Sequence, residues 1–410
     1  MGSKINKIFL LDAIFILLLF ATPVLQWTFP WGIESNFSFN LNGVSFYYTE
    51  LFYLLIIFKI FYLKKKNGKV KGIILILLSF GVFTSFISAL GNNNPNWISN
   101  FFISLDFYFY GILFCLIKLK VNHLKIIRYV VLFYFFYVAA QQFLVPTGLI
   151  QIETSTSLKD AGGIYRIGTS IGSPIATGYF ILMMSGILLL LFKNKTLKKT
   201  ILITTFLVTL LTLSRGPILS FVLVIFIVYI KKVKTLFLSL KFYFFIFLLL
   251  FGLNSLNKKF SVLDIIELRF AAENVTSNRD SKWTETLDIY KKNSIALGAG
   301  NNLVPLQRAL LSKAKAVEGK TSSPHNFFLS YLVETGLIGL VCILALMMYL
   351  FYQIFKTKNV DTYSKYTFLI LFVTLINLEL NLRNGVISFI FWFLFFLIKY
   401  NYDNSQNRLN

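Results

Sequence analysis

Long apolar runs recur along almost the whole chain and decide the solvent in which it folds. A helix that crosses about 30 Å of hydrocarbon needs about 20 mostly apolar residues. Hydrophobic residues make up 56% of the 410 positions, above the roughly 45–50% of a globular domain. We therefore predict an all-α polytopic membrane protein with about 12 transmembrane helices. The twelve apolar runs are residues 8–27, 45–63, 72–90, 101–119, 126–145, 175–192, 200–213, 217–230, 236–253, 336–355, 367–381 and 386–400.

Basic residues indicate the side of the membrane on which each loop lies, because lysine and arginine gather in short cytoplasmic loops. With the N-terminus inside, 23 of the 40 basic residues fall on inner segments, and the short outer loops hold only Lys159, Arg166, Arg215 and Arg383. This split predicts a bacterial inner-membrane protein with both termini in the cytoplasm. It also explains the net charge of +23 without nucleic-acid binding, because no basic groove or helix of the usual kind is present.

One outer loop is large and divides the chain into three regions. Residues 1–253 hold the first nine predicted helices, residues 254–325 form this periplasmic loop, and residues 326–410 hold the last three helices and a cytoplasmic tail. The loop is expected to be helical. One helix opens near Arg279, with apolar residues at helical spacing (Trp283, Leu287 and Tyr290) and Gly298 as its stop signal. A second short helix is expected in "VPLQRALLSKAKAVEG".

The cysteines and histidines predict no metal and no cofactor. Cys115 and Cys342 both fall inside apolar runs, so they suit neither a disulfide framework nor a metal cluster. His123 lies in a cytoplasmic basic loop, and His325 lies on the outer side without a second histidine at ligand spacing.

Outer-face chemistry in such a protein must use energy already stored in the substrate, since the periplasm lacks ATP. Isoprenoid-linked diphosphates are the common form, and the planar fork of arginine suits phosphate oxygens. Arg215, in "LTLSRGPILS", is the leading candidate because a positive residue at an outer turn runs against the topology rule. The alternative is a snorkelling interfacial arginine. Arg166, Arg279 and Arg383 are weaker candidates, each with a structural role open to it.

"KTSSPHNFFLSYLVETGLIGL" places His325 where a hydrophilic stretch meets an apolar run. Imidazole accepts a proton near neutral pH, so His325 is a candidate general base for a lipid-linked substrate. Ser322 or Ser323 is expected to cap the helix that starts near Asn326. Glu334 lies inside the apolar run and is a functional candidate, which either pairs with an arginine or caps a break in the helix.

Four motifs in order resemble the O-antigen ligase and polymerase superfamily of polytopic membrane glycosyltransferases. They are "YRIGTSIGSPIATGYF", then "LTLSRGP", then "NRDSKW" followed by "ALGAGNN", and last "SPHNFFLSYLVETGLIGL". The resemblance implies a metal-independent enzyme that takes a glycan from undecaprenyl diphosphate and passes it to an acceptor sugar hydroxyl. It implies that Arg215 and Arg279 bind the donor diphosphate and that His325 deprotonates the acceptor. Arg166 matches an arginine of some members.

The motifs fit a polymerase, which joins undecaprenyl-diphosphate-linked repeat units, and equally a ligase, which moves the finished glycan onto lipid A–core. The composition, rich in Phe, Ile, Lys and Asn, favours the polymerase. A polysaccharide flippase is a third hypothesis, but charged residues spread along its spans would be expected instead of one large outer loop. The expected partners are the lipid-linked donor and acceptor, membrane lipid and, for a polymerase, a chain-length regulator.

The charge split predicts the outcome of reporter fusions. Fusions after Asn96, Ser157 and Lys282 should be periplasmic, and a fusion after Lys195 should be cytoplasmic. The measurement is paired alkaline phosphatase and green fluorescent protein activity in intact cells. The opposite signal at any of these positions would overturn the count of twelve helices.

Overall fold

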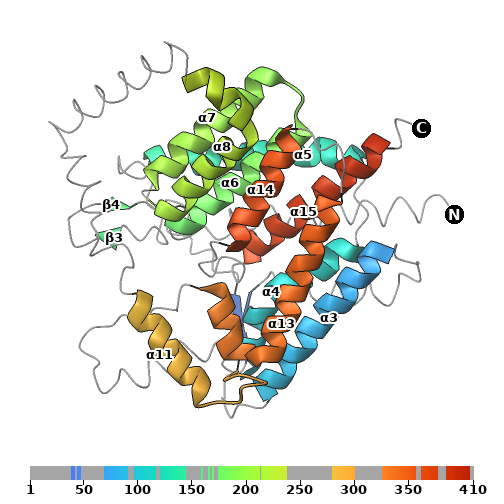
Figure 1. Ribbon diagram of the computed structural model, residues 1–410, viewed down its shortest axis with the longest axis vertical. Helices are drawn as coiled ribbons and strands as arrows, with labels where there is room; N and C mark the ends of the chain where they lie inside the picture. The colour runs from blue at the N-terminus through green and yellow to red at the C-terminus, as the bar shows by residue number, and fades with distance from the viewer. Residues whose placement is uncertain are drawn as a thin grey trace.

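The computed structural model is built mainly from helices, with two short antiparallel hairpins (Figure 1). One hairpin pairs β1 (Ser38–Leu41) with β2 (Val44–Tyr47), and the other pairs β3 (Leu158–Lys159) with β4 (Tyr165–Arg166). The structure describes residues 38–41, 44–47, 69–90, 97–116, 121–144, 158–159, 165–166, 169, 174–212, 214–237, 279–300, 326–356, 362–376 and 385–406.

The helices confirm a multi-pass membrane protein. In the described ranges, four are long and apolar enough to cross a membrane: Lys71–Leu90, Leu124–Leu144, Pro174–Leu191 and Phe327–Gln353. The helices are α3 (Lys69–Leu90), α4 (Trp97–Leu116), α5 (Val121–Leu144), α6 (Pro174–Leu191), α7 (Lys195–Leu211), α8 (Arg215–Phe237), α11 (Arg279–Lys291), α13 (Phe327–Phe355), α14 (Thr362–Ile376) and α15 (Gly385–Gln406). The total of twelve transmembrane helices stays a prediction.

Most predicted runs coincide with a helix to within a few residues, and two start in the wrong place. The run 45–63 begins inside β2, and the run 336–355 begins where α13 breaks, although α13 itself starts at Phe327. The run 8–27 lies outside the described residues. So does 236–253, apart from its first two residues, which end α8.

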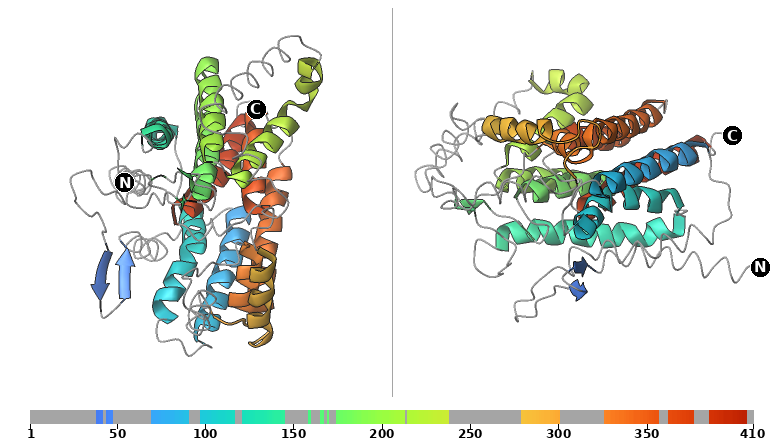
Figure 2. Two further views of the ribbon diagram at one scale, coloured as in Figure 1. Left: turned by 90° about the vertical axis from the view of Figure 1, so that its left-hand side faces the viewer. Right: turned by 90° about the horizontal axis from the view of Figure 1, so that it is seen from below.

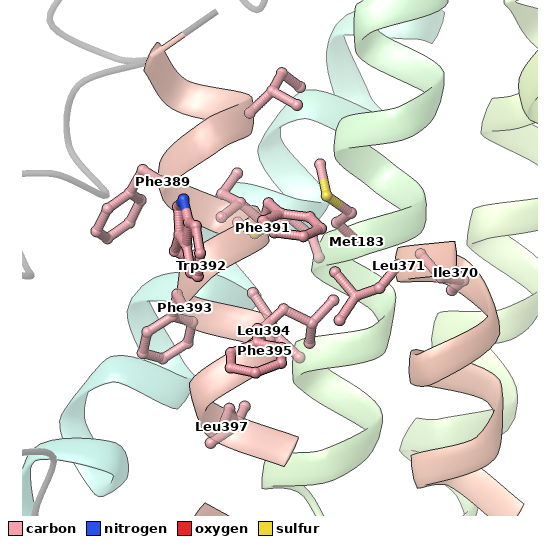
Figure 3. Close-up of a cluster of buried hydrophobic side chains, with 14 of the residues drawn as sticks. Met183, Ile370, Leu371, Phe389, Phe391, Trp392, Phe393, Leu394, Phe395 and Leu397 are labelled. Atoms are coloured by element: carbon pink, nitrogen blue, oxygen red, sulfur yellow. The ribbon is translucent and has the colours of Figure 1, made fainter. Parts of the chain in front are cut away.

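Helix α6 is the centre of one group of helices. It packs against α5, α7, α8, α14 and α15, and its side chains from Pro174 to Leu189 are nearly all buried. A helix that is apolar on every side is stable only when neighbours surround it or lipid does, and here neighbours do. Met183 of α6, Ile370 and Leu371 of α14, and residues 389–397 of α15 meet in one buried cluster (Figure 3).

A second group contains α3, α4, α11 and α13, and α15 joins it to the first because it packs against both α4 and α6. Figure 2 shows α3 and α13 side by side. At the junction, the indole Nε1 of Trp392 donates a hydrogen bond of 2.7 Å to the carbonyl oxygen of Phe107. Trp392 is fully buried, and a buried indole N–H needs such a partner. This bond therefore fixes α15 against α4.

Helix α13 is broken at Gly336, whose φ of 69° and ψ of −170° are not helical. In an unbroken helix the amides of Leu337 and Ile338 would donate to the carbonyls of Val333 and Glu334, four residues earlier. The break frees all four groups. In a membrane-spanning helix such groups must find another partner inside the protein, because lipid offers them none.

The loop that follows α11 supplies these partners. Residues 295–300 enter the break and form two hydrogen bonds with each side of it. The pairs are Ala299 N to Val333 O at 2.6 Å, Gly300 N to Glu334 O at 3.0 Å, Leu337 N to Ile295 O at 3.0 Å and Ile338 N to Ala296 O at 3.3 Å. The backbones approach so closely that a Cβ on Gly298 would lie 2.6 Å from the amide nitrogen of Gly336. Gly298 has a φ of 74° and lies in this loop, so it is not the stop signal of α11, which ends at Lys291.

Replacing Gly336 by alanine should destabilise the protein by more than about 2 kcal/mol, because a side chain at this φ is strained. Its Cβ would also collide with the backbone of Ala296 and Leu297. Thermal unfolding of the purified protein in lipid nanodiscs measures the effect. Gly72→Ala is the matched control, since nothing lies within 4 Å of a Cβ there and alanine favours a helix. Equal melting temperatures for the two variants would contradict the structure at the break.

Candidate functional site

Arg215 is the first residue of α8 and is half-buried. Thr212 and Ser214 shape the turn that precedes it. The amide of Thr212 continues the α7 ladder to Val208 O at 3.1 Å, and its hydroxyl accepts from the amide of Ser214 at 3.3 Å. The first amides of a helix have no partner within the helix and favour an anion nearby. A cation and a helix N-terminus therefore coincide at this turn.

The start of α6 lies directly against the Arg215 turn. A Cβ on Gly178 would lie 2.5 Å from Pro217, and a Cβ on Gly216 would lie 2.9 Å from the hydroxyl oxygen of Tyr179. Each glycine is thus needed for this close approach. The contact fixes the turn on α6, whose side chains are nearly all buried.

Thr169, in the first of the four motifs, is bonded to the start of α6 as well. The hydroxyl groups of Thr169 and Thr177 are 2.9 Å apart, and the amide of Thr169 donates to Thr177 Oγ1 at 3.3 Å. Thr177 precedes Gly178 in α6, so the structure brings the motif that holds Arg166 to the turn that holds Arg215. Arg166 itself is placed by its backbone, as the last residue of β4 opposite Leu158.

Arg279 is the first residue of α11, as the sequence predicts. This helix packs against the first part of α13, where Ile289, Ala299 and Val333 form a small buried cluster. The helix predicted from the spacing of Trp283, Leu287 and Tyr290 is present. Of these three side chains only Tyr290 packs against the cluster, whereas Trp283 and Leu287 are exposed, each with 37% of its surface accessible. The buried face carries Ile289 and the polar residue Thr286 instead. Which face of α11 is buried depends on the loop of residues 295–300 that enters the α13 break, so the sequence alone does not predict it.

Asn326 caps α13. Its Oδ1 accepts from the amide of Leu329 at 3.1 Å, and its carbonyl oxygen accepts from the amide of Ser330 at 2.9 Å. This is the role that we expected of Ser322 or Ser323, and asparagine is among the best residues for it. His325 directly precedes this cap in the sequence. His325 and Arg383 lie outside the described residues, as does the second helix expected in the large loop.

Glu334 is buried, with 2% of its surface accessible, and its carbonyl is one of the groups freed by the α13 break. That carbonyl accepts from Gly300 N and also from the hydroxyl of Ser88 in α3. Ser88 was not found from the sequence. The available signal was its spacing of four residues from Thr84 within an apolar run, which places both hydroxyls on one side of a helix.

The candidate residues thus form two groups. Arg166 and Arg215 belong to segments that meet at the start of α6, whereas Arg279 and Glu334 belong to α11 and α13, which pack together. Figure 1 shows α11 beside α13, in the part of the molecule with α3 and α4, while α8 lies with α6 and α14. Among the described residues, no group of three or more His, Cys, Asp and Glu could hold a metal ion.

Comparison with known proteins covers the middle of the chain. A family model described as O-antigen ligase matches residues 200–344. This range contains Arg215, Arg279, His325 and Glu334, and it ends shortly after the α13 break. A search of curated proteins gave no match. The family match confirms the resemblance of this chain to the O-antigen polymerase and ligase superfamily of membrane enzymes, and residues 200–344 are the part that carries it.

Proposed function

We propose that the chain is a polysaccharide polymerase that joins undecaprenyl-diphosphate-linked repeat units at the periplasmic face of the bacterial inner membrane. One observation carries the proposal: the matched range 200–344 holds Arg215, Arg279 and His325. In the proposed topology twelve helices cross the membrane, both termini are cytoplasmic, and residues 254–325 form the periplasmic loop. A chain-length regulator is a candidate protein partner.

The reaction breaks the bond between the anomeric carbon of the donor glycan and its diphosphate oxygen. A hydroxyl oxygen of the acceptor sugar forms the new glycosidic bond, and its proton passes to the imidazole of His325. Undecaprenyl diphosphate leaves with the bonding electrons. Negative charge grows on its phosphate oxygens, so fixed cations nearby lower the barrier. No metal is needed in this scheme, because arginine supplies the positive charge.

Arg215 is suited to the donor because of its surroundings. It is half-buried at the N-terminus of α8, the end of this helix that the proposed topology assigns to the outer side. Partial burial strengthens its attraction to an anion. The packing of Gly178 on Pro217 holds its backbone in place. Arg279 is proposed as the second diphosphate ligand and Arg166 as an auxiliary one. Arg383 is an additional candidate at the last outer turn.

His325 is suited to be the base because it directly precedes the cap of α13. Phe327 is fully buried and Asn326 caps the helix, so the helix start that His325 precedes in the sequence is firmly packed. Glu334 is proposed to support this helix at its break.

A second function, O-antigen ligase, is favoured by the description of the matching family and would use the same residues with lipid A–core as the acceptor.

The test of function uses purified protein in nanodiscs with lipid-linked repeat units as the sole sugar substrate and no added metal. A polymerase makes a ladder of lipid-linked chains from this substrate alone. A ligase makes product only when lipid A–core is added. Absence of product under both conditions, with protein that is folded by its melting curve, would overturn both functions.

Arg215→Lys and Arg279→Lys should each lose most of the ladder, because a single ammonium cannot reproduce the two-pronged contact of guanidinium with phosphate. The expected fall is about 10²-fold or more, the typical cost of removing one oxyanion contact. Arg128→Lys is the control. Its guanidinium stacks on Tyr129, with 4.5 Å from Cζ to the ring centroid, at the predicted cytoplasmic side. Near-normal rates for both test variants would show that the forked contact is not needed.

His325→Gln should reduce turnover by about 10²–10⁴-fold, the usual contribution of a general base, because glutamine keeps a hydrogen bond but not the basicity. Donor binding should be unchanged, since the proposed diphosphate ligands remain. The rate of the wild-type enzyme should fall as the pH drops below the pKa of histidine, ordinarily about 6.5, because imidazolium cannot accept a proton. Initial rates and donor affinity from pH 5 to 8 measure both effects. A wild-type rate in His325→Gln would assign the base elsewhere, with Glu334 to be tested first.

A further inference from the structure

Ser88 of α3 lies where three separate parts of the chain meet. It is fully buried, and its hydroxyl donates to the carbonyl oxygen of Leu297 at 2.7 Å and to that of Glu334. Leu297 belongs to the loop after α11, and Glu334 lies at the break in α13. One hydroxyl hydrogen is thus shared by two acceptors, an arrangement known from bifurcated bonds. Ser88 is therefore bonded to both sides of the joint between the loop and the helix.

The joint controls how α11 and α13 sit relative to each other. The loop begins directly after α11, and its amides and carbonyls bond to both sides of the α13 break. Two further bonds stiffen the loop: Gly298 N donates to Ser294 O at 2.7 Å, and the hydroxyl of Tyr290 donates to Ile295 O at 2.8 Å. Because the loop is stiff, a shift at the joint is passed on to α11 as a whole.

We propose that Ser88 is a positioning residue for the transfer reaction: it locks the loop after α11 into the break of α13 and so fixes one helix against the other. The inference rests on the proposed function, in which Arg279 at the start of α11 binds the donor diphosphate and His325, just before α13 in the sequence, deprotonates the acceptor. Ser88 touches neither donor nor acceptor. It acts by holding α11 and α13 in register, and it lies outside the range that matches the O-antigen ligase family.

The hydrogen bonds of Ser88 matter because catalytic groups must be held in accurate positions relative to the substrate. A displacement of about 1 Å far from the chemistry can cost about 10²-fold in rate. Without the Ser88 hydroxyl, the carbonyl of Glu334 keeps its bond to Gly300 N, so the joint should loosen rather than unfold. The expected defect is therefore in turnover and not in folding.

The test compares Ser88→Ala with Thr84→Val. Thr84 lies one turn earlier on α3 and is also buried, but its hydroxyl bonds to Gly81 O of the same helix at 2.9 Å. Per folded molecule, Ser88→Ala should lower kcat by about 10- to 100-fold, while Thr84→Val keeps the wild-type kcat. Hydrogen exchange at the amides of 295–300 and 333–338 should accelerate in Ser88→Ala alone. If Ser88→Ala does not fold, Ser88→Cys, which keeps the size but donates weakly, takes its place with the same expectation.

An unchanged kcat in the Ser88 variant would overturn the proposal, whether or not hydrogen exchange at the joint accelerates. So would an equal loss of kcat in Thr84→Val, because the effect would then belong to α3 as a whole. These outcomes are separate from the proposed function. If His325→Gln and both arginine variants are fully active, the catalytic assignment fails, although the exchange experiment can still show Ser88 holding the joint.

Discussion

Hydrogen bonding of the backbone within lipid is the constraint on which this structure depends. A membrane-spanning helix satisfies its own amides and carbonyls, and a break leaves groups that must be paired inside the protein. Helix α13 breaks at Gly336, and residues 295–300 pair all four freed groups. The segment that follows α11 is therefore not an appendage. Part of it completes a membrane helix, and neither the loop nor the helix has its hydrogen bonds satisfied without the other.

This joint relates the architecture to the proposed chemistry. The break in α13 follows the helix start that Asn326 caps, and the loop that fills it follows the helix that opens at Arg279. Broken membrane helices commonly mark binding sites, since irregular backbone at depth is tolerated only where protein surrounds it or a cavity lies beside it. The part of the site around Arg166 and Arg215 is built differently. Glycines and small hydroxyl residues let the Arg215 turn, the start of α6 and the Thr169 segment approach one another closely.

Glycine carries different information at different positions of this chain. Gly298 and Gly336 adopt positive φ and touch each other's backbone, whereas Gly178 has an ordinary helical conformation and is needed only for contact with Pro217. Gly298 reads as a helix stop in the sequence, and Gly336 as an interruption in an apolar run. Gly298 does not end α11, and that these two glycines meet is decided by tertiary structure, because 38 positions separate them.

The sequence by itself determined that this is a helical membrane protein, where most helices lie, that α11 opens at Arg279, and which family the chain resembles. Apolar length, basic loops and local motifs are properties of single segments, so they can be read one segment at a time. Tertiary structure decided the rest: which face of α11 is buried, that Asn326 caps α13, and that Ser88 of α3 bonds to Leu297 and Glu334. These depend on partners up to 246 positions away. The burial and hydrogen bonds of a residue are set by the segment that packs against it, and no local sequence pattern identifies that segment.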